Sequence, residues 1–77
     1  MQPVKKFNAG GIQVAVWENE RKDGGKFNTI SMDRSYKNDK DEWQKTNTLR
    51  ISDIPKAIAA LSKAYDFTVI KEPETAQ

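Results

Sequence analysis

Hydrophobic and polar residues alternate in the segment GGIQVAVWE near the start of the chain. Ile12, Val14 and Val16 occupy every second position there. A period of two in β-branched residues is typical of a strand with one buried face. The segment Asp23-Gly24-Gly25 follows and supplies the positive-φ positions that a hairpin loop needs. The pattern therefore predicts a strand that leads into a β-hairpin.

The segment KFNTISMDRSYKNDKDEWQKTNTLRI, residues 26–51, alternates in the same way but is richer in charge. We interpret it as two strands joined by the polar turn KNDKDE, not as a linker. With Tyr36 opposite Trp43 and Trp17 opposite Phe27, the apolar residues of three strands share one inner face, so that this register is favoured. The predicted inner face consists of Ile12, Val14, Val16, Ile30, Met32, Leu49 and Ile51.

The segment SDIPKAIAALSKAYDF has helical spacing of its apolar residues. Ser52 or Asp53 is the predicted cap, and Pro55 falls in the first turn, where its missing N–H is harmless. We expect a helix over 54–67 that covers the inner face. Its small residues suit either covering the sheet or close contact with a second helix: Ala57, Ala60 and Ala64.

These elements predict an α+β fold, in which a curved antiparallel sheet of three to four strands is followed by one C-terminal helix packed on one face. The fourth strand is VKKFNA, with Gly10-Gly11 as its turn. We expect one domain over residues 1–72 and a frayed tail over 73–77. An OB-like barrel is disfavoured, because five strands do not fit before the helix.

The composition argues against catalysis and against a bound cofactor or metal. The 77 residues include neither histidine nor cysteine, which removes the commonest bases, nucleophiles and metal ligands. The segment DGGK lacks the remainder of a phosphate-binding loop. The acidic residues of NDKDE lie in a turn without the spacing of a calcium loop. We therefore expect a non-enzymatic protein.

The net charge of +2 permits a nucleic-acid partner without requiring one. No apolar run approaches the roughly 20 residues that span a bilayer, and the first residues lack the apolar stretch of a signal peptide. We therefore expect a cytoplasmic protein with no membrane partner.

The opposite, outer face of the predicted sheet carries Trp17 and Phe27 among hydroxyl and amide side chains, with Arg50 beside them. Aromatic rings among basic groups suit the stacking of single-stranded bases. Cross-strand aromatic pairs also stabilise sheets without any ligand, so both interpretations stay open.

A second predicted cluster lies at the far end of the inner face: Arg34, Tyr36, Trp43 and Lys45. It is either an amphipathic end of the core or the tip of a projecting ribbon. Arg34 is predicted opposite Lys45, and like charges across a ladder are unfavourable unless an anion lies between them. This pairing favours a phosphate ligand.

The segment KFNTISMDRSYKNDKDEWQKTNTLRISDIPKAIAALSKA resembles the C-terminal domain of the coactivator positive cofactor four and its small bacterial relatives, a Whirly-like group of single-stranded DNA-binding proteins. The shared features are an aromatic on each side of a polar turn, Tyr36 and Trp43, and a final strand LRISD that runs into the helix. The chain is also similar to small prokaryotic proteins without an assigned activity.

The resemblance implies a homodimer formed through the helices and binding of single-stranded DNA, in transcription, replication or repair. The residues that fit this role by type and position are Trp17, Phe27, Arg34, Tyr36, Lys37, Trp43, Lys45 and Arg50. RNA is an open alternative to DNA. The rival hypothesis is a protein-interaction domain, such as a phage or mobile-element accessory protein, because Trp, Tyr and Arg also form protein hot spots.

Overall fold

The computed structural model describes residues 2–70, and the predicted tail over 73–77 and the domain end at 72 lie outside the described residues. The elements are β1 (Lys5–Ala9), β2 (Ile12–Glu20), β3 (Lys26–Lys37), β4 (Trp43–Thr46), a 3-10 turn η1 (Ile51–Asp53) and α1 (Ile54–Val69).

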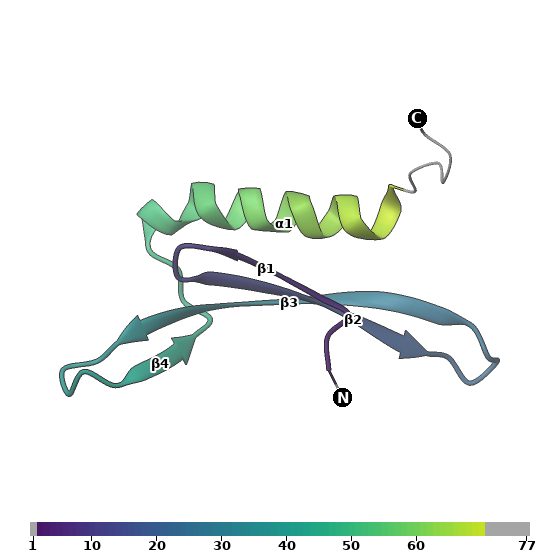
Figure 1. Cartoon of the computed structure of the whole chain (residues 1–77), viewed down its shortest axis with the longest axis horizontal. Helices are drawn as coiled ribbons and strands as arrows, with labels where there is room; N and C mark the ends of the chain where they lie inside the picture. The colour runs from purple at the N-terminus through teal and green to yellow at the C-terminus, as the bar shows by residue number, and fades with distance from the viewer. Residues whose placement is uncertain (1, 71–77) are drawn as a thin grey trace.

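The four strands form one antiparallel sheet in the order β1-β2-β3-β4. Figure 1 shows α1 lying along one face of this sheet and the β3–β4 hairpin projecting beyond the end of the helix. The predicted α+β class, with a sheet followed by one helix, is confirmed. The additional N-terminal strand is present as β1.

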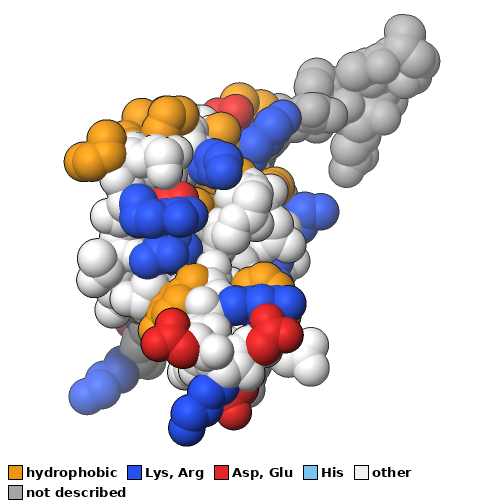
Figure 2. Space-filling view, turned by 90° about the vertical axis from the view of Figure 1, so that its left-hand side faces the viewer, with side chains coloured by type: hydrophobic (Ala, Val, Ile, Leu, Met, Phe, Trp, Pro, Cys, Tyr) orange, Lys and Arg blue, Asp and Glu red, His pale blue; other side chains and the backbone are white. Residues whose placement is uncertain are grey.

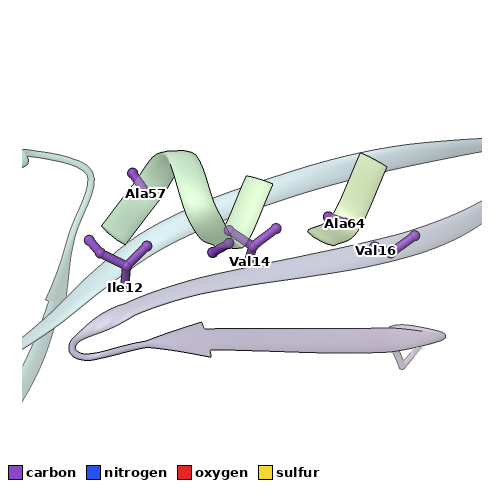
Figure 3. Packing of buried hydrophobic residues seen from close by; sticks show 6 residues of the cluster. Ile12, Val14, Val16, Ala57 and Ala64 are labelled. Carbon is purple, nitrogen blue, oxygen red and sulfur yellow. The ribbon is translucent and has the colours of Figure 1, made fainter. Parts of the chain in front are cut away.

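The core lies between β2 and α1. Ile12, Val14 and Val16 are fully buried because their period of two directs all three toward the helix. They meet the small side chains of Ala57, Ala60 and Ala64, which are also buried (Figure 3). The alanines therefore cover the sheet, and their size lets the helix approach it closely.

The helix packs on β1 and β2, so the inner face of β3 is only partly covered. Met32 and Leu49 are partly buried against the core. Ile30 is 42% exposed and Ile51 87% exposed. Both had been predicted on the buried face, and Ile51 is not in a strand at all, since it begins the 3-10 turn.

The β1–β2 turn brings the chain close to β3. Gly10 has a φ of +61°, in the left-handed region that glycine adopts without steric cost. A Cβ added at Gly11 would lie 2.8 Å from the Ser35 carbonyl oxygen. The Ser35 N–H donates to the Gly11 carbonyl over 2.8 Å, so this turn is held against the third strand.

The β2–β3 register differs by two residues from the predicted one. Trp17 lies opposite Thr29, and Phe27 lies opposite Asn19. The reason is the loop, in which the Arg21 N–H donates to the Gly25 carbonyl and only Gly24 has positive φ. A three-residue loop closed in this way fixes the pairing. A shift of two residues keeps every side chain on its predicted face.

The β3–β4 register differs by one residue, which reverses the faces of β4. Lys37, not Tyr36, lies opposite Trp43. Asn38 closes the loop: its N–H donates to the Glu42 carbonyl, and its Oδ1 accepts the N–H groups of Lys40 and Glu42. Asp41 takes the left-handed position with φ of 65°. Trp43 and Lys45 consequently lie on the outer face, not on the inner face as predicted.

Candidate nucleic-acid interface

The outer face of the sheet, opposite the helix, carries both tryptophans of the chain. It follows from the observed registers, because residues opposite one another in an antiparallel pair point to the same side. The outer face consists of Lys6, Asn8, Gln13, Ala15, Trp17, Asn19, Phe27, Thr29, Ser31, Asp33, Ser35, Lys37, Trp43 and Lys45.

Trp17 lies in the middle of this face and is half-buried. Its Nε1–H donates to the Ser31 hydroxyl over 2.9 Å, which fixes the orientation of the indole ring. The ring borders a hollow of about 190 Å³ whose lining includes Lys6, Asp33 and Lys45. A fixed ring beside a hollow is a suitable surface for stacking a flat ligand.

Trp43 lies at the start of β4 and is 67% exposed. The Lys37 ammonium lies 5.4 Å from the centroid of its ring, within the range of a cation–π contact. Trp43 also borders a second hollow, of about 480 Å³, formed with the Gly10-Gly11 turn. Gln13 and Lys45 line both hollows. The two indoles therefore belong to one continuous track across the outer face, which we call the tryptophan track.

Phe27 lies on the same face but near the β2–β3 loop, and it is 38% exposed. The Arg21 guanidinium lies 5.2 Å from the centroid of its ring. Phe27 borders neither hollow, so the predicted Trp17–Phe27 platform is replaced by a Trp17–Trp43 track.

Arg34 and Tyr36 lie on the inner face, with the Arg34 guanidinium 5.3 Å from the centroid of the Tyr36 ring. Arg34 is opposite Thr46, and Lys45 is opposite Ser35. The predicted like-charge pair of Arg34 and Lys45 is therefore wrong, since the two side chains point to opposite faces. Arg34 and Lys45 therefore do not form a site for a phosphate between them.

Both predicted arginines are held by one buried carboxylate, that of Asp53. The Arg34 Nε lies 3.4 Å from Asp53 Oδ2 and also donates to the Thr48 carbonyl. Arg50 binds the same carboxylate through its backbone N–H at 2.9 Å and through its guanidinium at 3.2 and 3.3 Å. Arg50 lies outside β4, which ends at Thr46. Arg34, on β3, therefore fastens the start of the helix to the sheet, and Arg50 fixes the turn that precedes the helix.

Asp53 is the residue before α1, as predicted. Its carboxylate accepts a hydrogen bond from the Arg50 backbone N–H and none from the first N–H groups of α1. The hydrogen bonds from the Arg50 side chain and backbone lower the pKa of Asp53 from the usual 3.8, and the charges of Arg50 and Arg34 lower it further. Burial acts in the opposite direction. A lowered pKa means that the ionised carboxylate stabilises the folded state.

Replacing Asp53 with asparagine is therefore expected to lower Tm at neutral pH. The difference from the wild type should shrink as the pH falls through 3.8 and below, because the wild-type carboxylate then becomes protonated and loses its contribution. Thermal unfolding followed by circular dichroism between pH 2 and 7 measures this. The matched control is Asp66→Asn on the exposed side of α1, which should show no such gap. A gap independent of pH would contradict the ion-pair role.

Lys6 and Gln13 belong to the tryptophan track. Gln13 was predicted on the outer face as one of its amide side chains, whereas Lys6 was not predicted there. β1 places Lys6 opposite Ala15, and the β2–β3 pairing places Gln13 opposite Asp33. The alternation in VKKFNA, read together with its turn, could have placed Lys6 on this face.

Charges of both signs surround the hairpin. Figure 2 shows hydrophobic side chains gathered on the side of α1, at the top of the view, and basic and acidic side chains close together below. The Lys37 ammonium lies 3.5 Å from the Asp41 carboxylate, in an exposed pair of the kind that contributes little stability. Lys37 can therefore exchange this partner for another anion at small cost.

In residues 2–70, no cluster of His, Cys, Asp or Glu is arranged to hold a metal ion. No helix among the described residues is both long enough and apolar enough to cross a membrane. No protein-family model matches the chain, and no curated protein or solved structure shows significant similarity to it.

Proposed function

We propose that the protein binds single-stranded DNA along the tryptophan track and has no enzymatic activity. The observation that carries this proposal is that the two hollows, each bordered by an indole ring, share Gln13 and Lys45. Successive bases stack on such rings, at about 1–3 kcal/mol per base, and the lysines accompany the phosphates. Lys6, Lys37 and Lys45 are the cations on this face.

The proposal assigns different roles to the eight residues that the sequence singled out. Trp17 and Trp43 stack bases, and Lys37 and Lys45 meet phosphates. Phe27 extends the face toward the β2–β3 loop. The remaining three, Arg34, Tyr36 and Arg50, shape the fold behind the face, since both arginines are engaged by Asp53. Single-stranded RNA would bind through the same contacts, because the track presents rings and ammonium groups and no group that distinguishes ribose from deoxyribose.

Low sequence preference and stacking suit a protein that acts on melted DNA in transcription, replication or repair in the cytoplasm of a prokaryotic cell. The alternative function is binding to another protein. The feature that favours it is the group of exposed acidic residues in the hairpin loop near Trp43, which would repel a nucleic acid and could bind a basic protein surface: Asp39, Asp41 and Glu42.

The test is fluorescence anisotropy of a short labelled single strand of mixed sequence, titrated with the protein at several salt concentrations. Three neutralised phosphates predict a slope of about −2 in log Kobs against log salt. A duplex of the same sequence, whose bases are already stacked on one another, should bind more weakly. Absence of binding up to about 100 μM protein, the weak end of non-specific affinities, would overturn the proposal and favour a protein partner.

We further propose that the protein acts as a homodimer. A second row of apolar residues runs along η1 and α1, beside the alanines that cover the sheet, and all its members are exposed. The row consists of Ile51, Ile54, Ile58, Leu61 and Tyr65. Its spacing of three and four residues is that of a helix–helix seam. A second copy of the chain presents the same row, so the two rows can pack against each other and bury their apolar side chains.

Replacing Ile58, which is 59% exposed, with aspartate should convert the dimer to a monomer, because a charge would be buried in the seam. Analytical ultracentrifugation at several concentrations measures the mass of the particle. The control is Ala59→Asp, which places the same charge on the exposed side of the helix one residue away. A wild-type mass equal to that of one chain, or a dimer that survives Ile58→Asp, would contradict a dimer of this kind.

A further inference from the structure

Asp33 presents an unpartnered oxygen within the tryptophan track. It lies on β3 opposite Gln13, and its side chain borders the hollow beside Trp17. Its Oδ1 is buried and accepts no hydrogen bond within the described residues. No ion pair in that part of the chain involves Asp33 either. A carboxylate oxygen withdrawn from water without a donor is unfavourable. A ligand that supplies an N–H would relieve this once the side chains around the hollow move and expose the oxygen.

The surroundings of Asp33 restrict what that ligand can be. The Trp17 Nε1–H is already donated to Ser31, so Trp17 offers its ring face and not a hydrogen bond. Lys6 and Lys45 line the same hollow and suit an anionic group attached to the ligand. The matching occupant is therefore a flat ring that carries N–H donors on one edge and a phosphate nearby, which describes a nucleotide.

We propose that this hollow selects guanine among the bases of a bound single strand. This inference rests on the proposed function and adds a preference to it. Guanine presents two neighbouring donors, N1–H and N2–H, on its Watson–Crick edge, so that one carboxylate accepts both in a bidentate arrangement. Single-stranded nucleic acids leave that edge free to be read.

The other bases fit Asp33 less well for a definite reason. Cytosine and adenine present one amino group beside a ring nitrogen that is an acceptor. Thymine presents its single N–H between two carbonyl oxygens, which face the carboxylate unfavourably. Guanine should therefore bind best at this position and thymine worst.

The experiment compares three labelled oligonucleotides that are identical oligo-dT strands except at one central position, which is dT, dG or deoxyinosine. Inosine keeps N1–H and lacks the N2 amino group. For the wild type, dG should bind roughly five- to 150-fold more tightly than dT, the discrimination given by a good bidentate contact, and inosine should lie between them. The comparison needs only the wild-type protein.

The variant Asp33→Asn has nearly the same shape, and its circular dichroism and Tm establish whether it folds as the wild type does. Its amide exchanges one acceptor for a donor, so the preference for dG over inosine should be lost. Equal binding of all three strands by the wild type, or an unchanged preference in a folded Asp33→Asn, would overturn this inference and leave the proposed function in place. Failure of every strand to bind would overturn both.

Discussion

Replacing Trp43 with alanine is expected to weaken the binding of single-stranded DNA by about five- to 150-fold, the equivalent of one lost stacked base. Trp43 is 67% exposed on the outer face, so its removal leaves no cavity in the core. The free energy of unfolding should therefore change little. Anisotropy titrations with one labelled strand at fixed salt measure the loss of affinity.

The matched control for Trp43→Ala is Tyr36→Ala. Tyr36 lies on β3 in the same hairpin, one position from the pair of Lys37 and Trp43, but on the inner face of the sheet. Both residues flank the polar turn in the sequence, and only the observed register separates their faces. Equal losses of affinity in the two variants would show that the hairpin tip, and not the outer face, contacts the strand.

Replacing Ile12 with alanine should lower the free energy of unfolding by about 2–5 kcal/mol, the usual cost of removing a fully buried isoleucine side chain. Ile12 is 0% exposed and packs beneath α1. A chain of 77 residues has a total stability of only about 4–12 kcal/mol, from a typical 0.05–0.15 kcal/mol per residue. The variant should therefore be largely unfolded at mild urea concentrations.

Urea unfolding followed by circular dichroism measures this effect, at one protein concentration for all variants so that self-association cancels. Ile70→Ala is the control, since it deletes the same atoms from a side chain that is 56% exposed and should cost far less. If Ile12→Ala cost no more than Ile70→Ala, the core would not lie between β2 and α1.

The sequence was sufficient to predict the faces of β2 and β3, because β-branched residues at Ile12, Val14 and Val16 leave one choice of buried side. The helix was predictable in the same way, but its buried face was not. The spacing also included Ile54, Ile58 and Leu61, which are exposed, and it left the alanines free to face either the sheet or a second helix.

Strand registers were not predictable either, because they depend on which loop residue takes the left-handed conformation. The left-handed residues are Gly24 in the first loop and Asp41 in the second. The composition of Gly24-Gly25 and of the turn KNDKDE does not show which residue of each loop takes that conformation.

The one-residue change in the β3–β4 register is what alters the candidate site. It moves Trp43 and Lys45 from the inner to the outer face, where they join Trp17. Had the turn been interpreted as a three-residue loop with Asp41 in the left-handed position, the pairing of Lys37 with Trp43 would have followed. The ion pair between Arg34 and Asp53 could not be predicted in this way, since the two residues come together only when the helix packs on the sheet.

The most direct test of binding along the tryptophan track is a ¹H–¹⁵N correlation spectrum recorded while single-stranded DNA is added. The two indole Nε1–H groups of Trp17 and Trp43 each give a signal apart from the backbone amides. Both should shift progressively on addition of the strand, together with the backbone amides of Gln13 and Lys45, while those of Ala59 and Lys63 on α1 stay in place. Shifts confined to α1, with both indole signals unmoved at saturating DNA, would contradict binding along the outer face.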